Sequence, residues 1–445
     1  MRSLVLLLDM AFLLPFALYR PFVGILVFDM VSFLNPQQLA WGIGTLPPWA
    51  LLAFLATLIG WFLSRTEPKS IPLTTLNLLI FAFLIGITVN MFFAIGPFDL
   101  EYNGWLRNLK IMLVLLVTSA LANSKQRVEA LIWVLVISIG YYILDQGGIT
   151  LITLGAHKAF GPPNSQISDN NEFAAAVLVI VPLINYLRLH ARSAFIRVGM
   201  AGAMGIAILT SLASYSRGAL LGLFAMAFML WIRSRRKFIS LTVLGVSLAV
   251  GLHFMPQAWW DRMDTIQNYQ GDNSAEDRLF IWRVGWLLAL RHPLTGAGFH
   301  ATDSLAVIRS VGSSGYRGME IHSIWLQILG EQGFAVTAIW LLMMVVSYMT
   351  ARKLARLSRS NPDLRWAGDL GRMGQVAIIA YAVSGTFLPI SCWDVYFTIL
   401  TVISSAYLVA SREIKMQPAT GAAPKLPSRT LRRPALTAAA SRVLP

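Results

Sequence analysis

Charged residues are scarce in this sequence. Asp, Glu, Lys and Arg make up 13% of the 445 residues, whereas hydrophobic residues make up 56%. Soluble domains carry about 25% charged residues. So few charges cannot cover a water-soluble fold of this length, which excludes a string of soluble domains. Long uncharged stretches recur to about residue 411, and we therefore predict an all-α polytopic membrane protein.

Cysteine and acidic residues are also rare. The single cysteine, Cys392, excludes an internal disulfide and a cysteine-based metal cluster. The loops predicted to be exported carry only isolated carboxylates and no zinc or Asp-x-Asp signature, so we expect neither a metal nor a cofactor. The net charge of +15 does not indicate nucleic acid, because the basic residues lie in short loops between apolar stretches. This positive-inside pattern, with some attraction to anionic lipid, indicates membrane lipids as partners.

Apolar stretches that approach the roughly 20 residues of a membrane span predict about twelve transmembrane helices. The first 34 residues form either two short spans, 3–18 and 22–34, or one broken helix, so the total is twelve or thirteen. The other predicted spans are 48–63, 71–95, 105–122, 126–144, 172–187, 194–213, 218–232, 238–256, 323–350, 373–388 and 394–411.

Lysine and arginine clusters fall on alternate loops, which we place in the cytoplasm. The prediction divides the chain into transmembrane helices (1–256), one large periplasmic loop (257–321), further transmembrane helices (322–411) and a basic tail (412–445) predicted to be disordered. The large loop contains a predicted helix, 276–291, whose stripe of Leu279, Trp282, Trp286 and Leu290 is typical of a membrane interface.

Three sites break the expected charge pattern on the exported face. Arg217 lies at a tight turn between two spans, Arg278 and Arg283 lie on the predicted interfacial helix, and His322 with Ser323 opens a long apolar helix. An arginine can bind phosphate through two parallel hydrogen bonds, and a neutral histidine can accept a proton. The alternatives are an interfacial anchor, solvated loop charges and a histidine at a helix start.

Two further features are weaker. Asp169 and Asn171 lie in a polar segment that leads into a span, where Asp169 or Asn170 can cap the helix. Glu331 lies within the long apolar helix and needs a partner, for which we consider Gln375 or an arginine near the exported side. Two arginines, a histidine and little acid favour a site that binds a diphosphate without Mg²⁺.

The same segments resemble the bacterial O-antigen ligase family within the O-antigen ligase and polymerase superfamily. Ser214-Tyr-Ser-Arg217-Gly-Ala-Leu220 resembles its arginine motif, and His322-Ser323, nine residues and then Gly333 resemble its second motif. The segment from Arg278 through Pro293 to Gly298 is similar to the superfamily's arginine-containing loop. Asn35-Pro36 and Gly161-Pro162-Pro163 are closest to its branch of O-glycosylation ligases.

The resemblance implies an inverting, metal-independent glycosyltransferase of the GT-C type at the periplasmic face of the bacterial inner membrane. It would move a glycan from undecaprenyl diphosphate to a sugar hydroxyl of lipid A–core, during lipopolysaccharide biosynthesis. Arg217 and Arg278 would hold the diphosphate and His322 would take the proton. We expect substrate binding by four further residues: Arg283, Asn171, Asp169 and Ser323.

Three alternatives remain open. An O-antigen polymerase and a protein O-oligosaccharyltransferase would use the same donor with another acceptor. A transporter or flippase is the alternative of a different class, and it should carry charged or broken helices near the bilayer midplane. Asp9, Asp29, Asn90 and Glu331 are instead scattered along the chain.

Overall fold

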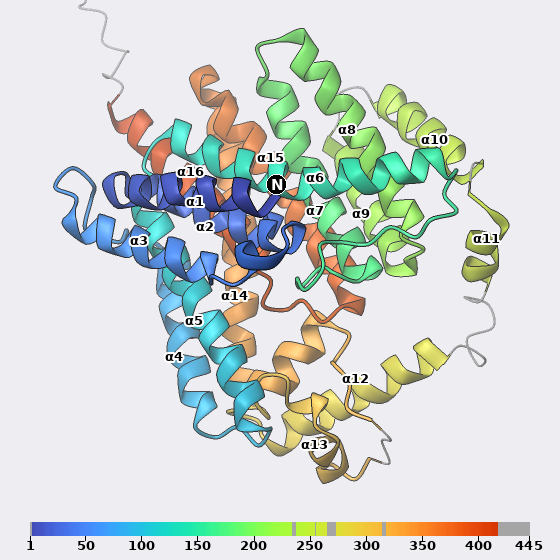
Figure 1. Cartoon of the computed structure of the whole chain (residues 1–445). Helices are drawn as coiled ribbons and strands as arrows, with labels where there is room; N and C mark the ends of the chain where they lie inside the picture. Colours follow the sequence, from blue (N-terminus) through green and yellow to red (C-terminus); the bar gives the residue numbers. More distant parts are fainter. Residues whose placement is uncertain (1, 234–236, 254, 265–272, 314–316, 417–445) are drawn as a thin grey trace, which may run out of the picture.

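In the computed structural model, the described residues are 2–233, 237–253, 255–264, 273–313 and 317–416. Within these ranges the regular elements are all helices (Figure 1). The α-helices are α1 (Arg2–Tyr19), α2 (Pro21–Leu34), α3 (Trp49–Leu63), α4 (Thr75–Met91), α5 (Phe98–Leu121), α6 (Lys125–Ile152), α7 (Asn170–His190), α8 (Ala194–Ala213), α9 (Arg217–Arg233), α10 (Lys237–His253), α11 (Gln257–Asp264), α12 (Asn273–Arg291), α13 (Leu305–Ser310), α14 (Ile324–Ser360), α15 (Arg365–Ser384) and α16 (Asp394–Met416).

The helices confirm the prediction of a polytopic membrane protein. Seven of the described helices are long and apolar enough to cross a membrane, and shorter apolar helices accompany them. At the N-terminus the chain forms two helices, α1 and α2, interrupted at Arg20 before Pro21, and α1 continues through Pro15. The number of spans that cross the bilayer stays a prediction.

Several helices are longer than the predicted apolar spans. α5 begins seven residues early, α6 continues to Ile152, α15 begins at Arg365, and α16 runs to Met416, into the predicted tail. The span predictions stopped where polar residues begin, but a helix can continue beyond the apolar zone as long as its backbone bonds are satisfied. The rest of that tail, from 417 on, lies outside the described residues, as do 265–272 of the large loop.

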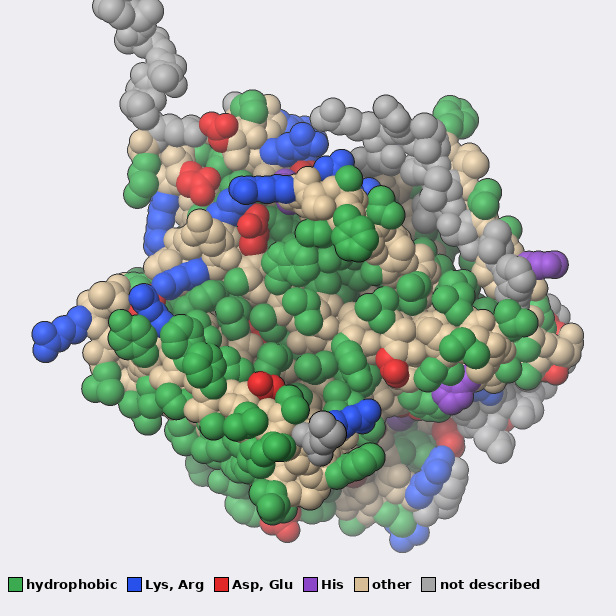
Figure 2. All heavy atoms as spheres, turned by 45° about the horizontal axis from the view of Figure 1, so that its top comes forward, with side chains coloured by type: hydrophobic (Ala, Val, Ile, Leu, Met, Phe, Trp, Pro, Cys, Tyr) green, Lys and Arg blue, Asp and Glu red, His purple; other side chains and the backbone are tan. Residues whose placement is uncertain are grey.

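The burial of the helices separates a core from a surface suited to lipid. In α7 and α16, 78% of the apolar window is buried, whereas α1 buries 17% and α8 buries 22%. A helix that is apolar on all sides and exposed needs an apolar environment. Figure 2 shows one face of the molecule, on which exposed hydrophobic side chains cover broad areas between groups of Lys and Arg. We infer that α1 and α8 face lipid around a core that contains α7 and α16.

The long helix α14 is interrupted at Gly333, the last residue of the second motif. Gly333 has φ 71° and ψ −179°, which only glycine adopts readily. The loop after α12 occupies the break: Ala297 N donates to Gly330 O (2.9 Å), Gly298 N donates to Glu331 O (2.9 Å), and Phe334 N donates to Pro293 O (2.8 Å). The break therefore ties the end of α12 to α14.

We predict that Gly333→Ala destabilises the protein and lowers its activity. A Cβ at this position would lie 2.8 Å from the Pro293 carbonyl oxygen and 2.9 Å from Gly296 N, in addition to the cost of the backbone conformation, about 1–3 kcal/mol. Thermal unfolding of the purified protein measures the effect. The matched control is Gly140→Ala in α6, where a Cβ meets nothing within 4 Å. Equal melting temperatures for the two variants would contradict the prediction.

Candidate functional site

A polar cavity of about 790 Å³ lies between the start of α7, the start of α12 and the segment before α14. It brings together four of the seven predicted site residues: Arg278, His322, Asp169 and Asn171. They come from three separate parts of the chain, so their meeting depends on how α7, α12 and α14 pack.

The other three predicted residues do not line this cavity. The Arg217 guanidinium donates from Nε and Nη2 to the Arg262 carbonyl on α11 (3.3 Å each). Arg283 is exposed on α12, five residues after Arg278 and therefore about 140° around the helix. Ser323 is buried as the N-cap residue of α14.

His322, which was predicted to open the long helix, lies two residues before α14 begins at Ile324. Its Nδ1 lies 2.8 Å from the Glu320 carbonyl oxygen. A carbonyl oxygen can only accept, so Nδ1 carries the proton in this contact and Nε2 is left with its lone pair in the neutral imidazole. Nε2 makes no hydrogen bond with any described residue. The tautomer is therefore the one a general base needs.

Trp282 connects the three motif segments. Its Nε1 donates to the His322 carbonyl (2.9 Å), and its ring lies beside Phe387 with centroids 5.9 Å apart. Gly218, next to Arg217, is so close to Phe387 that a Cβ there would lie 3.5 Å from the ring. Trp282 therefore departs from the predicted interfacial stripe, because this half-buried indole packs against the protein, whereas Leu279, Trp286 and Leu290 are exposed.

Asp169 caps α7, as predicted. Its Oδ1 accepts hydrogen bonds from Asn171 N (2.9 Å) and Asn171 Nδ2 (2.8 Å). Burial alone would raise the pKa of Asp169, but the hydrogen bonds outweigh it and hold the pKa below its ordinary value. Asp169 is thus a carboxylate at the cavity wall, able to accept a hydrogen bond from a sugar hydroxyl.

His300, Asp303 and Glu320 form a cluster that the sequence did not predict. His300 Nδ1 lies 3.5 Å from Asp303 Oδ2 and 3.9 Å from Glu320 Oε1. The hydrogen bond with Asp303 is the main cause that raises the pKa of His300 to about 9. Burial, and next the charge of Asp303, raises the pKa of Glu320. The expectation of isolated carboxylates is therefore wrong, because donor atoms of the three side chains lie within 4.8 Å of one another, close enough to share a metal ion.

Glu331 has different partners from those predicted. Its Oε1 accepts from Gln327 Nε2 and from His300 N, each at 3.4 Å. Gln375 instead donates to Tyr348 O. Tyr348 lies about 25 Å further along α14 than Glu331, at a rise of 1.5 Å per residue. The break at Gly333 brings the loop backbone to this carboxyl group, which a continuous helix would not do.

Several cations at the cavity were missed. Arg107 lines it from α5, and Arg317 lines it while pairing with Asp277 (Nη2 to Oδ2, 2.8 Å). Arg107, and Lys110 three residues later and outside this lining, lie in the first turns of a predicted span on the exported side, where the positive-inside rule disfavours them. The same signal that identified Arg217 was therefore present at these two positions.

These observations define a polytopic helical membrane protein with a polar cavity at one end of its bundle. Residues 202–341, which contain Arg217, Arg278 and His322, match the family model described as O-antigen ligase. This match supports the O-antigen ligase and polymerase superfamily, and with it a glycosyltransferase-like enzyme. Residues 1–192 match a family of unknown function. A search of curated proteins gives no significant match.

Proposed function

We propose that the protein is an O-antigen ligase, an inverting glycosyltransferase that moves a glycan from undecaprenyl diphosphate to a sugar hydroxyl of lipid A–core. The reaction needs no metal ion or cofactor and takes place at the periplasmic face of the bacterial inner membrane. The observation that carries the proposal is that Arg278 and His322, from two separate motifs of the matched segment, line one polar cavity.

An apolar cavity suits the lipid part of this donor. It has a volume of about 670 Å³ and lies between α8, α9, α10 and α11. Leu220 and Phe224 line it, and Arg217 lies three and seven residues before them, on the same face of α9. An isoprenoid chain in this cavity would bring its diphosphate to Arg217, with Arg278 as the second cation for the diphosphate and the attached glycan in the polar cavity.

With the residues at these positions, the proposed reaction runs as an inverting displacement. The acceptor hydroxyl oxygen attacks the anomeric carbon from the face opposite the diphosphate, so the configuration inverts. The bond between the anomeric carbon and the phosphate oxygen breaks, and undecaprenyl diphosphate leaves with the electron pair. His322 Nε2 takes the hydroxyl proton, while the arginines stabilise the charge that develops on the leaving group. Asp169 and Asn171 would orient the sugars.

The membrane topology belongs to the same proposal. Residues 257–321, which include α11, α12 and α13, would form the periplasmic loop, with membrane helices in 1–256 and 322–411 and a cytoplasmic tail. Ser323 would act by starting α14 and so fixing His322. The substrate-binding role of Arg283 stays a prediction.

His322→Ala should lower glycan transfer by about 10²–10⁴-fold, the usual contribution of a general base. The measurement is transfer from synthetic undecaprenyl-diphosphate-linked glycan by the purified protein, with donor affinity measured alongside. Donor affinity should stay near the wild-type value. His157→Ala, in an exposed loop outside the cavity, is the control. Retention of more than about a tenth of wild-type transfer would show that His322 is not the base.

The arginine variants should behave differently from the histidine variant. Arg217→Ala and Arg278→Ala should weaken donor binding as well as turnover, because both residues are assigned to the diphosphate. Arg217→Lys and Arg278→Lys should also fail, because a point charge does not reproduce the two parallel hydrogen bonds of a guanidinium group. Arg309→Ala, exposed on α13 and outside the cavity, is the control. Full activity of both lysine variants would contradict the assignment.

A further inference from the structure

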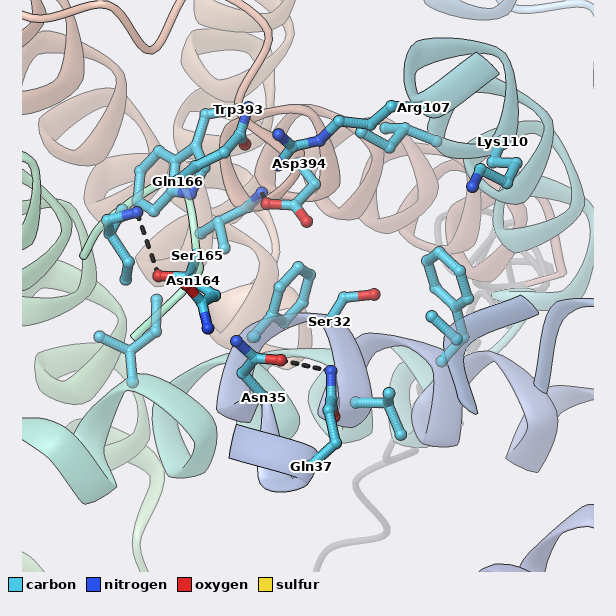
Figure 3. Close-up of a pocket in the computed structure, with 18 of the residues that line it drawn as sticks. Ser32, Asn35, Gln37, Arg107, Lys110, Asn164, Ser165, Gln166, Trp393 and Asp394 are labelled. Carbon is cyan, nitrogen blue, oxygen red and sulfur yellow. Dashed lines mark hydrogen bonds between the residues drawn. The ribbon is translucent and has the colours of Figure 1, made fainter. Parts of the chain in front are cut away.

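A second, smaller cavity adjoins the polar cavity. It has a volume of about 200 Å³ and shares Arg107, Asn164, Ser165 and Gln166 with its larger neighbour (Figure 3). Most of its lining comes from residues 1–192, the segment whose family has no known function. The two matched segments of the chain therefore meet at connected cavities.

Two cations of α5 face this smaller cavity. Arg107 and Lys110 lie three residues apart on one face of the helix, and neither makes a hydrogen bond or salt bridge with a described residue. Asp394 is the one described carboxylate in the lining, and Figure 3 shows the Arg107 guanidinium turned toward it. A further carboxyl group, Asp29, is buried outside the lining. The cavity wall thus carries two positive charges against one negative charge.

Two amide side chains add unused acceptors. Gln37 donates from Nε2 to Asn35 Oδ1, and Gln166 donates from Nε2 to the Cys392 carbonyl (3.5 Å). These bonds fix which end of each amide is the oxygen, and both Oε1 atoms are buried without a partner among the described residues. A buried acceptor without a donor costs free energy. Hydroxyl groups that enter between these side chains would supply the missing donors.

The backbone around the cavity is held in place by its own polar contacts. Asn35 and Asn164 both adopt positive φ, 52° and 53°. Asn35 Nδ2 donates to Pro163 O and Asn164 Nδ2 donates to Gln38 Oε1, each at 3.0 Å. These bonds clamp the 161–168 loop onto the end of α2, so the cavity is a built feature rather than a gap between helices.

From these observations we infer that the smaller cavity is a subsite for a single sugar that bears a carboxylate, a uronate, next to the bond that is formed or broken. The inference rests on the proposed function and deepens it. The two cations bind the carboxylate, and the amide oxygens accept hydrogen bonds from the ring hydroxyls. A cavity of this volume holds one sugar ring. The carboxylate compensates the one surplus positive charge, whereas a diphosphate would bring more negative charge next to Asp394.

The direct test is binding to the full-length protein in lipid nanodiscs, measured by calorimetry or ligand-observed NMR. The probes are methyl β-D-glucuronide, methyl β-D-glucoside and inorganic diphosphate. We expect the glucuronide to bind at least about tenfold more tightly than the glucoside, a difference of about 1.4 kcal/mol. Arg107→Gln and Lys110→Gln should each remove this preference, and Arg309→Gln on α13 should keep it.

Three results would overturn the inference. They are equal binding of the two glycosides by the wild-type protein, a glucuronide preference that survives both variants, and displacement of the glucuronide by diphosphate in an Arg107-dependent manner. The wild-type comparison keeps the test decisive even where a variant does not fold.

Transfer assays distinguish the donor from the acceptor as the source of the sugar. Substrate pairs that differ only by glucuronate in place of glucose are supplied first in the donor and then in the acceptor. Arg107→Gln should raise the KM of the glucuronate-bearing substrate about tenfold in one of these two assays, either as donor or as acceptor. An unchanged KM in both assays would overturn the inference. Loss of transfer with every substrate, while glucuronide binding persists, would reject the proposed function alone.

Discussion

The break of α14 at Gly333 is the constraint on which the rest of the site depends. A helix that crosses a membrane has to satisfy its own backbone hydrogen bonds, so an interruption is tolerated only where other protein groups take over. Here the loop from Pro293 to Gly298 does so. Because this loop follows α12 directly, the break fixes α12 against α14 and sets Arg278 and His322 around one cavity. The backbone conformation of Gly333 is thus what allows this contact between the loop and α14.

The cavity also joins the two halves of the chain. The matched O-antigen ligase segment supplies Arg278 and His322, whereas the N-terminal segment supplies Asp169, Asn171 and Arg107. This arrangement suggests a division of labour. Groups suited to proton transfer and phosphate binding come from one segment, and groups suited to sugar recognition come from the other. The proposed uronate subsite would extend this division, because the lining of the smaller cavity is mostly N-terminal.

Much of the fold could be predicted from the sequence, because long apolar stretches and the breaks between them directly define helices. The helix predicted over 276–291, which the structure extends to 273–291, the turn at Arg217 and the cap at Asp169 followed from the same local reasons. Contacts that depend on packing could not be predicted. Trp282 was expected by its spacing to lie in an interfacial stripe. Gln375 or an arginine was considered as the partner of Glu331, because the break in α14 leaves no local signal beyond a glycine.

The cations Arg107 and Lys110 of the smaller cavity show where more could have been inferred. Arg107 and Lys110 violate the positive-inside rule as clearly as Arg217 does, and the sequence alone could have identified them. The cluster of His300, Asp303 and Glu320 is different. Its members are brought together by the loop between α12 and α14, and neither their spacing nor their type indicates that they meet.

The central claim is that side-chain cations, and no metal ion, support transfer of a glycan from a lipid diphosphate. It is tested most directly by assaying the purified protein in excess EDTA with undecaprenyl-diphosphate-linked glycan. Lipid A–core, a second lipid-linked glycan and a peptide are supplied in turn as acceptors. The account predicts that transfer to lipid A–core stays near its untreated rate. Loss of transfer in EDTA with rescue by Mg²⁺ or Mn²⁺ would contradict the mechanism, and transfer only to the glycan or the peptide would contradict the assignment as a ligase.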